Sequence, residues 1–270
     1  MSIVAQPYAH GMADILDSGV DWISASAPVG PQGTDLRVFM DGIVADEEST
    51  GNEHNVFEWR GYRGYRAGRA SIAENDDYVI CSLASSLAHR WHGSIATLAT
   101  NVSRLDLQVT VMANQSSDMD YAKQAWDALG QAGIRQQARR GYTLIENSRG
   151  GSTLYCGSRR SDAYLRLYDK SAKSPEYEEG TWRFEVELKH RRAEEAWKVA
   201  RDLGYSPSLT AGTVYEWFAR VGLASPFLPI EASRLVDYAG SQRTWSGNFA
   251  GYEPKSDLQS AGSENEDLPY

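Results

Sequence analysis

The 270-residue sequence lacks several features that define whole classes of protein. Its two cysteines, Cys81 and Cys156, form no CxxC pair and no Cys/His cluster of zinc spacing, which argues against a disulfide scaffold or a structural zinc site. It contains no run of about 18 apolar residues and no charged start followed by an apolar stretch. A phosphate-binding P-loop is also missing. We therefore expect a cytoplasmic protein that does not span a membrane.

Acidic residues outnumber basic ones. The sequence has 27 lysines and arginines and 36 aspartates and glutamates, which gives a net charge of −9. Taken alone, this charge argues against a nucleic-acid partner. The charge is unevenly distributed, however. Residues 1–58 carry −9 and residues 202–270 carry −5, whereas residues 59–134 are neutral and residues 135–201 carry +5. An anionic ligand would bind most easily to the basic segment.

Hydrophobic residues make up 41% of the chain, enough for a packed core. The pattern predicts strands, a helix, four further strands and another helix. The clearest strand is 182–189, where apolar and charged residues alternate. This order indicates an α+β fold with a central, mainly antiparallel β-sheet and flanking helices, in which one face of the sheet is polar. The sequence shows no internal repeat.

The expected domain organisation has four parts. Residues 1–18 form an N-terminal extension and residues 19–204 the main domain. Residues 205–250 form a helical C-terminal appendage, and the acidic residues 251–270 form a disordered tail.

Polar side chains stand out on three of the predicted strands. Asp106 projects from strand 105–109, Arg166 and Tyr168 project from strand 164–168, and Glu185 and Glu187 project from strand 182–188. If these strands are neighbours, carboxylates from two of them converge beside a tyrosine and an arginine. Carboxylates repel one another unless a cation lies between them, and oxygen ligands alone suit Mg²⁺ or Mn²⁺. The alternative is that Asp106 and Glu185 simply pair with Arg166 and Arg183 on a solvated face.

Three motifs that follow one another give the sequence a resemblance to a known family. They are Thr153-Leu154-Tyr155-Cys156-Gly157-Ser158-Arg159-Arg160-Ser161, Leu165-Arg166-Leu167-Tyr168-Asp169-Lys170 and Arg183-Phe184-Glu185-Val186-Glu187-Leu188-Lys189. This pattern resembles the replication initiation factor family, the rolling-circle initiators of plasmids, filamentous phages and conjugative elements. The resemblance covers roughly residues 19–201.

The resemblance implies an HUH-endonuclease-like catalytic core in which carboxylates replace the histidine pair. It implies a metal-dependent DNA nickase with Tyr168 as nucleophile and Mg²⁺ or Mn²⁺ held by Asp106, Glu185 and Asp169. Arg166 or Lys170 would lower the phenol pKa or hold a phosphate oxygen. Because Asp169 follows Tyr168 directly, a regular strand would point it to the opposite face, and Glu187 is then the substitute.

Arginines that recur every three residues between tyrosines suggest contacts with unpaired DNA. We expect these contacts from Arg60, Arg63 and Arg66, and further phosphate contacts from Arg159, Arg160 and Arg183.

The leading hypothesis is a rolling-circle initiator that nicks and rejoins origin DNA through a 5′-phosphotyrosyl bond. The alternatives are a conjugative relaxase with the same chemistry and a non-catalytic origin-binding protein. The expected partners are origin DNA, single-stranded or in a stem-loop, a host helicase, a host DNA polymerase and a second copy of the chain.

Overall fold

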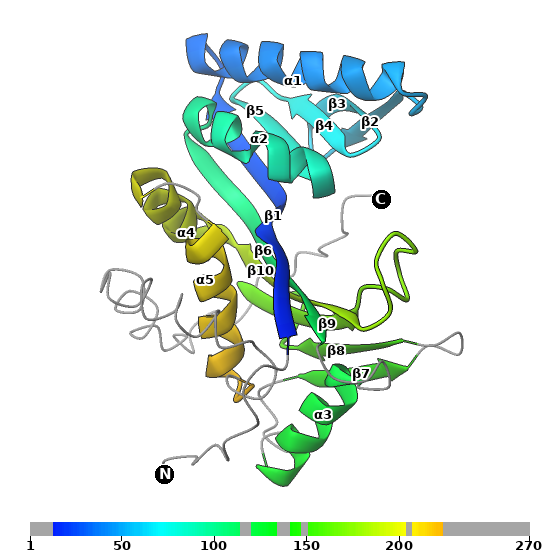
Figure 1. Ribbon diagram of the computed structural model, residues 1–270. Coiled ribbons are helices and arrows are strands. Elements are labelled where there is room, and N and C mark those ends of the chain that lie inside the picture. The colour runs from blue at the N-terminus through cyan, green and yellow to red at the C-terminus, as the bar shows by residue number, and fades with distance from the viewer. Residues whose placement is uncertain (1–12, 114–119, 134–140, 147–150, 204–206, 224–270) are drawn as a thin grey trace.

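The computed structural model describes residues 13–113, 120–133, 141–146, 151–203 and 207–223. Figure 1 shows a long twisted sheet with helices packed along it. The strands are β1 (Ala13–Pro28), β2 (Asn55–Trp59), β3 (Tyr62–Ala67), β4 (Ala70–Glu74), β5 (Tyr78–Ala84), β6 (Asn101–Ala113), β7 (Tyr142–Glu146), β8 (Ser152–Cys156), β9 (Ala163–Asp169) and β10 (Thr181–Lys189). The helices are α1 (Pro31–Ser49), α2 (Ser85–Leu98), α3 (Tyr121–Gln131), α4 (His190–Leu203) and α5 (Pro207–Arg220).

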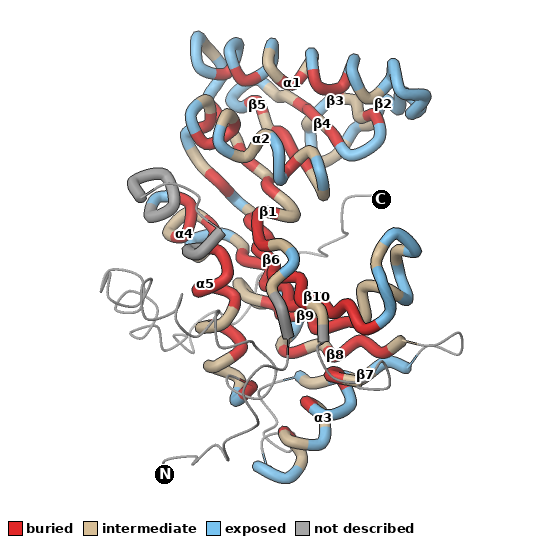
Figure 2. The backbone as a smooth tube through the Cα atoms, in the orientation of Figure 1, coloured by how far each residue is buried: buried red, intermediate tan, exposed pale blue. Residues whose placement is uncertain are grey.

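The strands form one ten-stranded sheet in the order β2-β3-β4-β5-β1-β6-β10-β9-β8-β7. Every pair of neighbours is antiparallel. The expected α+β fold with an antiparallel sheet is thus confirmed. The two long strands β1 and β6 lie at the centre of the sheet. Figure 2 shows many buried residues along β1, β6, β10 and β9.

The fold contains a repeat that the sequence does not reveal. The first half runs β1, α1, four strands and α2, and the second half runs β6, α3, four strands and α4. The strand orders of the two halves mirror each other about the β1–β6 pair. In both halves the final strand leads directly into a helix whose first residue has a left-handed backbone, Ser85 with φ 54° and His190 with φ 49°. We call residues 13–98 the N-half and residues 101–203 the C-half.

One apolar core unites the two halves. Alternate residues of β6 and β10, such as Leu107 and Val186, are buried together with apolar residues of the helices. Helix α5 belongs to this core as well, because Phe218 is fully buried and its ring lies 5.3 Å from that of Phe184 on β10. Burial of these side chains is the main stabilising contribution to the fold.

Several boundaries differ from those expected from the sequence. Residues 13–18 are part of β1 and pair with β6, so the expected extension 1–18 is in part a central strand. Helix α5 packs against β6, β1 and β10 instead of forming an appendage. The short strand β4, residues 70–74, has too few residues to give a clear alternation and was not expected. Residues 251–270 lie outside the described residues.

Candidate functional site

The sheet face opposite the apolar core carries a buried polar surface in the C-half. Strand alternation places Asp106, Gln108 and Thr110 of β6 on this face, and the register aligns them with Glu187, Glu185 and Arg183 of β10. Tyr168 and Arg166 of β9 lie opposite Arg183 and Glu185. The expected neighbourhood of these three strands is therefore present. The face is not solvated, since Asp106 is 1% exposed and Glu185 3% exposed.

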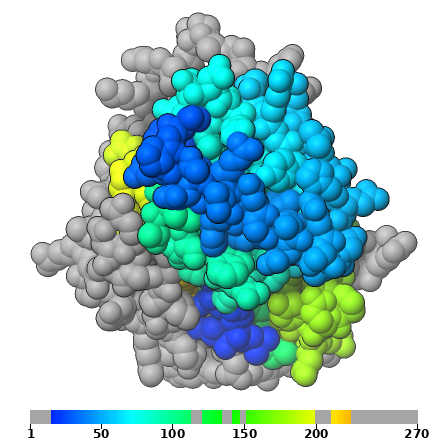
Figure 3. All heavy atoms as spheres, turned by 90° about the horizontal axis from the view of Figure 1, so that it is seen from above, coloured from blue at the N-terminus to red at the C-terminus, as the bar shows by residue number. Residues whose placement is uncertain are grey.

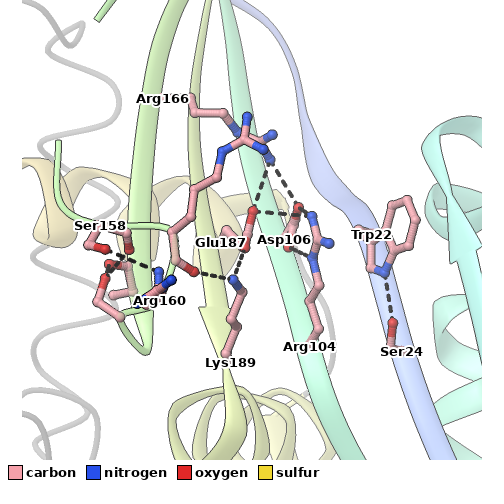
Figure 4. A network of polar contacts seen from close by, with 12 residues as sticks. Trp22, Ser24, Arg104, Asp106, Ser158, Arg160, Arg166, Glu187 and Lys189 are labelled. Carbon is pink, nitrogen blue, oxygen red and sulfur yellow. Dashed lines mark hydrogen bonds and ion pairs between the residues drawn. The ribbon is translucent and has the colours of Figure 1, made fainter. Parts of the chain in front are cut away.

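Arg166 binds three carboxylates at once, those of Asp106, Glu185 and Glu187. Figure 4 shows its contacts with Asp106 and Glu187. Its Nη2 lies 3.1 Å from Oδ2 of Asp106 and 3.6 Å from Oε2 of Glu187, and it also pairs with Oε1 of Glu185. Its buried Nε has no hydrogen-bond partner among the described residues. One guanidinium thus occupies the position between the carboxylates that a cation is expected to fill.

Two further cations complete this cluster. Arg104 donates from Nε to Oδ1 of Asp106 at 3.0 Å and from Nη2 to Oδ2 at 2.8 Å, and the same Nη2 reaches Glu187 at 3.2 Å. Lys189 lies 2.7 Å from the other oxygen of Glu187. Three carboxylates therefore face three cations, which permits their burial. We call Arg104, Asp106, Arg166, Glu185, Glu187 and Lys189 the carboxylate cluster.

The protonation equilibria in the carboxylate cluster follow the depth of each acid. Burial raises the pKa of Glu185 to about 7, and the attraction of Arg166 offsets only part of this effect. Burial likewise raises the pKa of Asp106 despite the pull of Arg104. For Glu187, the raising effect of burial is outweighed by Arg104 and Lys189, so its pKa lies below the ordinary value.

Tyr168 lies beside this cluster and beneath the β9–β10 connection, residues 170–180. Its side chain is buried, and Nζ of Lys173 lies 3.9 Å from the centre of its ring. Burial, followed by the charge of Glu185, raises the Tyr168 pKa well above that of a free phenol, and Arg183 opposes the shift. Figure 3 shows the connection, in yellow-green, at the molecular surface. Lys173 of this connection therefore covers part of the phenol ring.

Arg183 is an internal anchor. It is 5% exposed, donates from Nε to Thr110 at 2.9 Å, and reaches Asp21 at 3.1 Å and the Tyr177 hydroxyl at 3.4 Å. Asp21 can reach it because the β1–β6 register shifts between Val20 and Trp22, which marks a β-bulge. Arg183 is the cross-strand neighbour of Tyr168, and its side chain is buried by these contacts. A buried side chain is not available for the DNA contact expected of Arg183.

Asp169 and Lys170 are not brought into the carboxylate cluster. Asp169 follows the strand parity, and its Oδ1 accepts hydrogen bonds from Ser171 Oγ at 2.6 Å and the Ala172 backbone N–H at 2.9 Å. It thus fixes the start of the β9–β10 connection. The Lys170 ammonium lies 5.1 Å from the centre of the Tyr177 ring. Glu187, which the sequence analysis names as the substitute for Asp169, lies in the carboxylate cluster.

The arginines expected to bind DNA occupy different surfaces. Arg159 and Arg160 are exposed in the β8–β9 turn, and the Arg159 carbonyl accepts a hydrogen bond from Lys189 at 2.6 Å, which joins the turn to the carboxylate cluster. Arg60 lies in the two-residue β2–β3 turn, where it and Gly61 both have positive φ. Arg63 and Arg66 are three residues apart on β3, so they point to opposite faces of the sheet. The arginines at three-residue spacing therefore form no single surface.

Sequence reasoning missed four residues of this region. Arg104 and Lys189 could have been found, because each is two residues from a carboxylate of the cluster, Asp106 or Glu187, and shares its face. Asp21 depends on a bulge and Lys173 on the path of a connection. No sequence pattern signals these two positions.

The carboxylates of the cluster are the type of ligand that a divalent metal ion prefers. Asp106, Glu185 and Glu187 offer the hard oxygen ligands that Mg²⁺ and Mn²⁺ prefer. In this structure all three carboxylates are paired with Arg166. Among the described residues, no group of three histidine, cysteine or carboxylate side chains is arranged to hold a metal.

Comparisons with known proteins agree with this fold. The family model of the replication initiation factor matches residues 100–211, and the resemblance expected from the sequence is thereby confirmed. A solved structure of a rolling circle replication initiator protein from Geobacillus stearothermophilus is similar with a TM-score of 0.53 and 16% sequence identity. The similarity covers 83% of this chain and 96% of that one. No curated protein matches the sequence.

The described helices include none that is both long and apolar enough to cross a membrane.

Proposed function

We propose that the protein initiates rolling-circle replication by nicking one strand of origin DNA with Tyr168 as the nucleophile. The observation that carries this proposal is the placement of a buried tyrosine beside a carboxylate cluster in the segment that matches replication initiation factors. In the proposed step the Tyr168 oxygen bonds to phosphorus and the bond from phosphorus to the 3′-oxygen breaks. The phenol loses its proton and the leaving 3′-oxygen gains one. The products are a 5′-phosphotyrosyl bond and a free 3′-OH.

Because the pKa of Tyr168 is raised, the site must supply positive charge that favours ionisation of the phenol. A phenol whose pKa lies above its ordinary value is almost entirely protonated at neutral pH, and only the ionised form attacks well. Positive charge near the ring favours ionisation, and Arg183, Arg166 and Lys173 are the nearby cations. An incoming phosphate brings negative charge, which the unpartnered Nε of Arg166 is suited to bind.

Asp106, Glu185 and Glu187 are the residues that would hold Mg²⁺ or Mn²⁺. When bound, such an ion polarises the scissile phosphate and neutralises the charge that develops on it. Arg166 pairs with the same three carboxylates, so these residues could hold an ion only if the guanidinium withdrew from them. Release of Arg166 from the carboxylates would leave it available to hold the phosphate.

Other parts of the function follow from this chemistry. A single matched nucleophile allows one nicking event, so closing the strand after a round of synthesis calls for a second copy of the chain or another nucleophile. The free 3′-OH requires a host DNA polymerase, and duplex unwinding requires a host helicase because the sequence has no P-loop. We expect Arg159 and Arg160, which are exposed in the turn bonded to Lys189, to contact DNA phosphates next to the carboxylate cluster.

A nicking assay on supercoiled DNA carrying the cognate origin tests the proposal. In Mn²⁺ we expect open-circular product with protein attached to the 5′ end, mapped to Tyr168 by mass spectrometry. Tyr168→Phe should lose at least about a hundredfold in nicking rate because the nucleophile is gone. Tyr164→Phe is the matched control, as Tyr164 is a buried tyrosine on the same strand and face. Equal loss in both variants, or nicking by Tyr168→Phe, would contradict the assignment and favour a non-catalytic origin-binding role.

A further inference from the structure

A second site lies on the same sheet face in the N-half. It is a pocket of about 450 Å³ bounded by β1 to β5, and its walls include the rings of Trp22 and Phe57. Ala70, Ser71 and Ser82 also line it. The dimensions and the mainly apolar lining with a few polar groups are typical of a small-ligand site. We call this the Trp22 pocket.

The charge around the Trp22 pocket selects for an anionic ligand. Arg66 and Arg69 line it, and the lining residues that the structure describes include no carboxylate. Trp22, Asn55 and Phe57 of the lining belong to residues 1–58, which carry a net charge of −9, yet none of the acidic residues of that segment that the structure describes lines the pocket. Aromatic walls combined with arginines suit a ligand that has a flat ring and a phosphate.

The Trp22 pocket and the carboxylate cluster are joined by direct contacts. Trp22 is the cross-strand partner of Asp106, and the Arg104 guanidinium that binds Asp106 lies 4.5 Å from the centre of the Trp22 ring (Figure 4). The Trp22 indole N–H in turn donates to Ser24 Oγ at 2.8 Å. A DNA strand that crosses the carboxylate cluster on this face would therefore reach the Trp22 pocket after crossing one or two β-strands.

We propose that the Trp22 pocket receives an unpaired base of the single-stranded DNA next to the scissile phosphate. This inference rests on the proposed nicking function and names its second contact with substrate. The base would stack on Phe57 or Trp22, and its edge would face the hydroxyls of Ser71 and Ser82. Duplex DNA offers no free base face, so the pocket favours melted or looped DNA over paired DNA.

The test is binding of fluorescein-labelled dT12 to the full chain in EDTA, where a metal-dependent nickase does not cleave. The comparison probe is an abasic 12-mer with the same phosphates. Wild type should bind dT12 more tightly, and Phe57→Ala should weaken dT12 binding about tenfold without affecting the abasic probe. Val56→Ala is the matched control, because Val56 is the neighbouring residue, is 79% exposed and lies outside the pocket. Ser71→Trp, which fills the pocket without removing Phe57, should reproduce the loss.

Equal affinity of Phe57→Ala and wild type for dT12, with both variants folded by circular dichroism, would overturn the inference. Displacement of dT12 by dTMP alone at micromolar concentration would also overturn it, because the occupant would then be a free nucleotide. The nicking assay separates the two proposals. If Tyr168→Phe is inactive while Phe57→Ala binds normally, only the pocket assignment fails. If Tyr168→Phe still nicks, only the nucleophile assignment fails. The weaker binding of dT12 by Phe57→Ala, compared with the abasic probe, still tests the pocket assignment.

Discussion

The N-half and the C-half share one strand topology but carry different side chains on the sheet face opposite the apolar core. In each half, the residue three positions before the final helix pairs across to the long central strand. In the C-half these residues are Glu187 and Asp106, and in the N-half they are Ser82 and Ser24. The C-half pair is bound by Arg104 and Arg166, whereas the two serine hydroxyls lie 2.7 Å apart and bond each other.

This difference shows that the scaffold does not itself create the chemistry. The same strand arrangement supports a dense charged cluster in one half and a largely apolar pocket in the other. Charged side chains can be buried in the C-half only because three cations accompany three carboxylates. Serines in the N-half need no such partners, which leaves room for a cavity. The following experiments probe this contrast.

Removal of Arg166 should have the largest effect on stability. Arg166→Met leaves three buried carboxylates with fewer cations, and we expect a loss of about 3–5 kcal/mol in the free energy of unfolding. Urea denaturation in EDTA measures it. Arg63→Met in the N-half is the control, since its ion pair with Glu58 is exposed and 3.8 Å long, and it should change stability by less than about 0.5 kcal/mol. A loss below about 1 kcal/mol for Arg166→Met would mean that the cluster is not held by this guanidinium.

Helix α5 has no counterpart in the N-half, and Phe218 tests its contribution. Phe218 is fully buried against Phe184, so Phe218→Ala should cost about 3 kcal/mol through lost burial and a residual cavity. Thermal unfolding of the full chain measures the effect. A change within about 0.5 kcal/mol would indicate that α5 is the separable appendage that the sequence suggested.

The serine pair of the N-half should contribute far less than the carboxylate cluster. Ser82→Ala removes the hydrogen bond to Ser24, and the expected cost is about 1 kcal/mol. Ser71→Ala, at the position paired with Ser82 on β4, serves as the control. Losses of about 3 kcal/mol or more from Ser82→Ala would contradict the contrast between the two halves.

The smallest effect concerns pH and His92 of the N-half. Burial lowers the His92 pKa, although its Nδ1 lies 3.0 Å from the Ala88 carbonyl oxygen. The unfolded chain therefore takes up a proton more readily, so stability is present above about pH 6.5 and is lost as pH falls below it. His92→Gln should reduce the difference between urea midpoints at pH 7.5 and pH 5. An unchanged difference would show that His92 is not the group responsible.

Much of the carboxylate cluster could be predicted from the sequence. The alternation in 105–109, 164–168 and 182–188 placed Asp106, Arg166, Tyr168, Glu185 and Glu187 on one face, as found. The parity of Asp169 also indicated Glu187 as its substitute. Arg183 was misjudged, because alternation gives the face of a side chain but not what covers that face. The β9–β10 connection and the β1 bulge bury it.

The N-half was harder to predict. Arginines every three residues at 60–66 suggested one DNA-binding surface, yet β3 divides Arg63 and Arg66 between opposite faces. The Trp22 pocket is assembled from five strands and has no signature within any of them. The topological repeat was also hidden, since two chains with different side chains can adopt the same strand order.

By itself, the sequence determined the class of fold, the polar and apolar faces of the central strands, and the family that residues 100–211 resemble. These properties depend on local periodicity and short motifs, which neighbouring residues encode. Only the tertiary structure decided that Arg166 bridges three carboxylates, that Arg183 faces inward, and that two halves share one sheet. Those outcomes depend on strand order, a bulge and long-range pairing, where the contacting residues lie tens of positions apart in the chain.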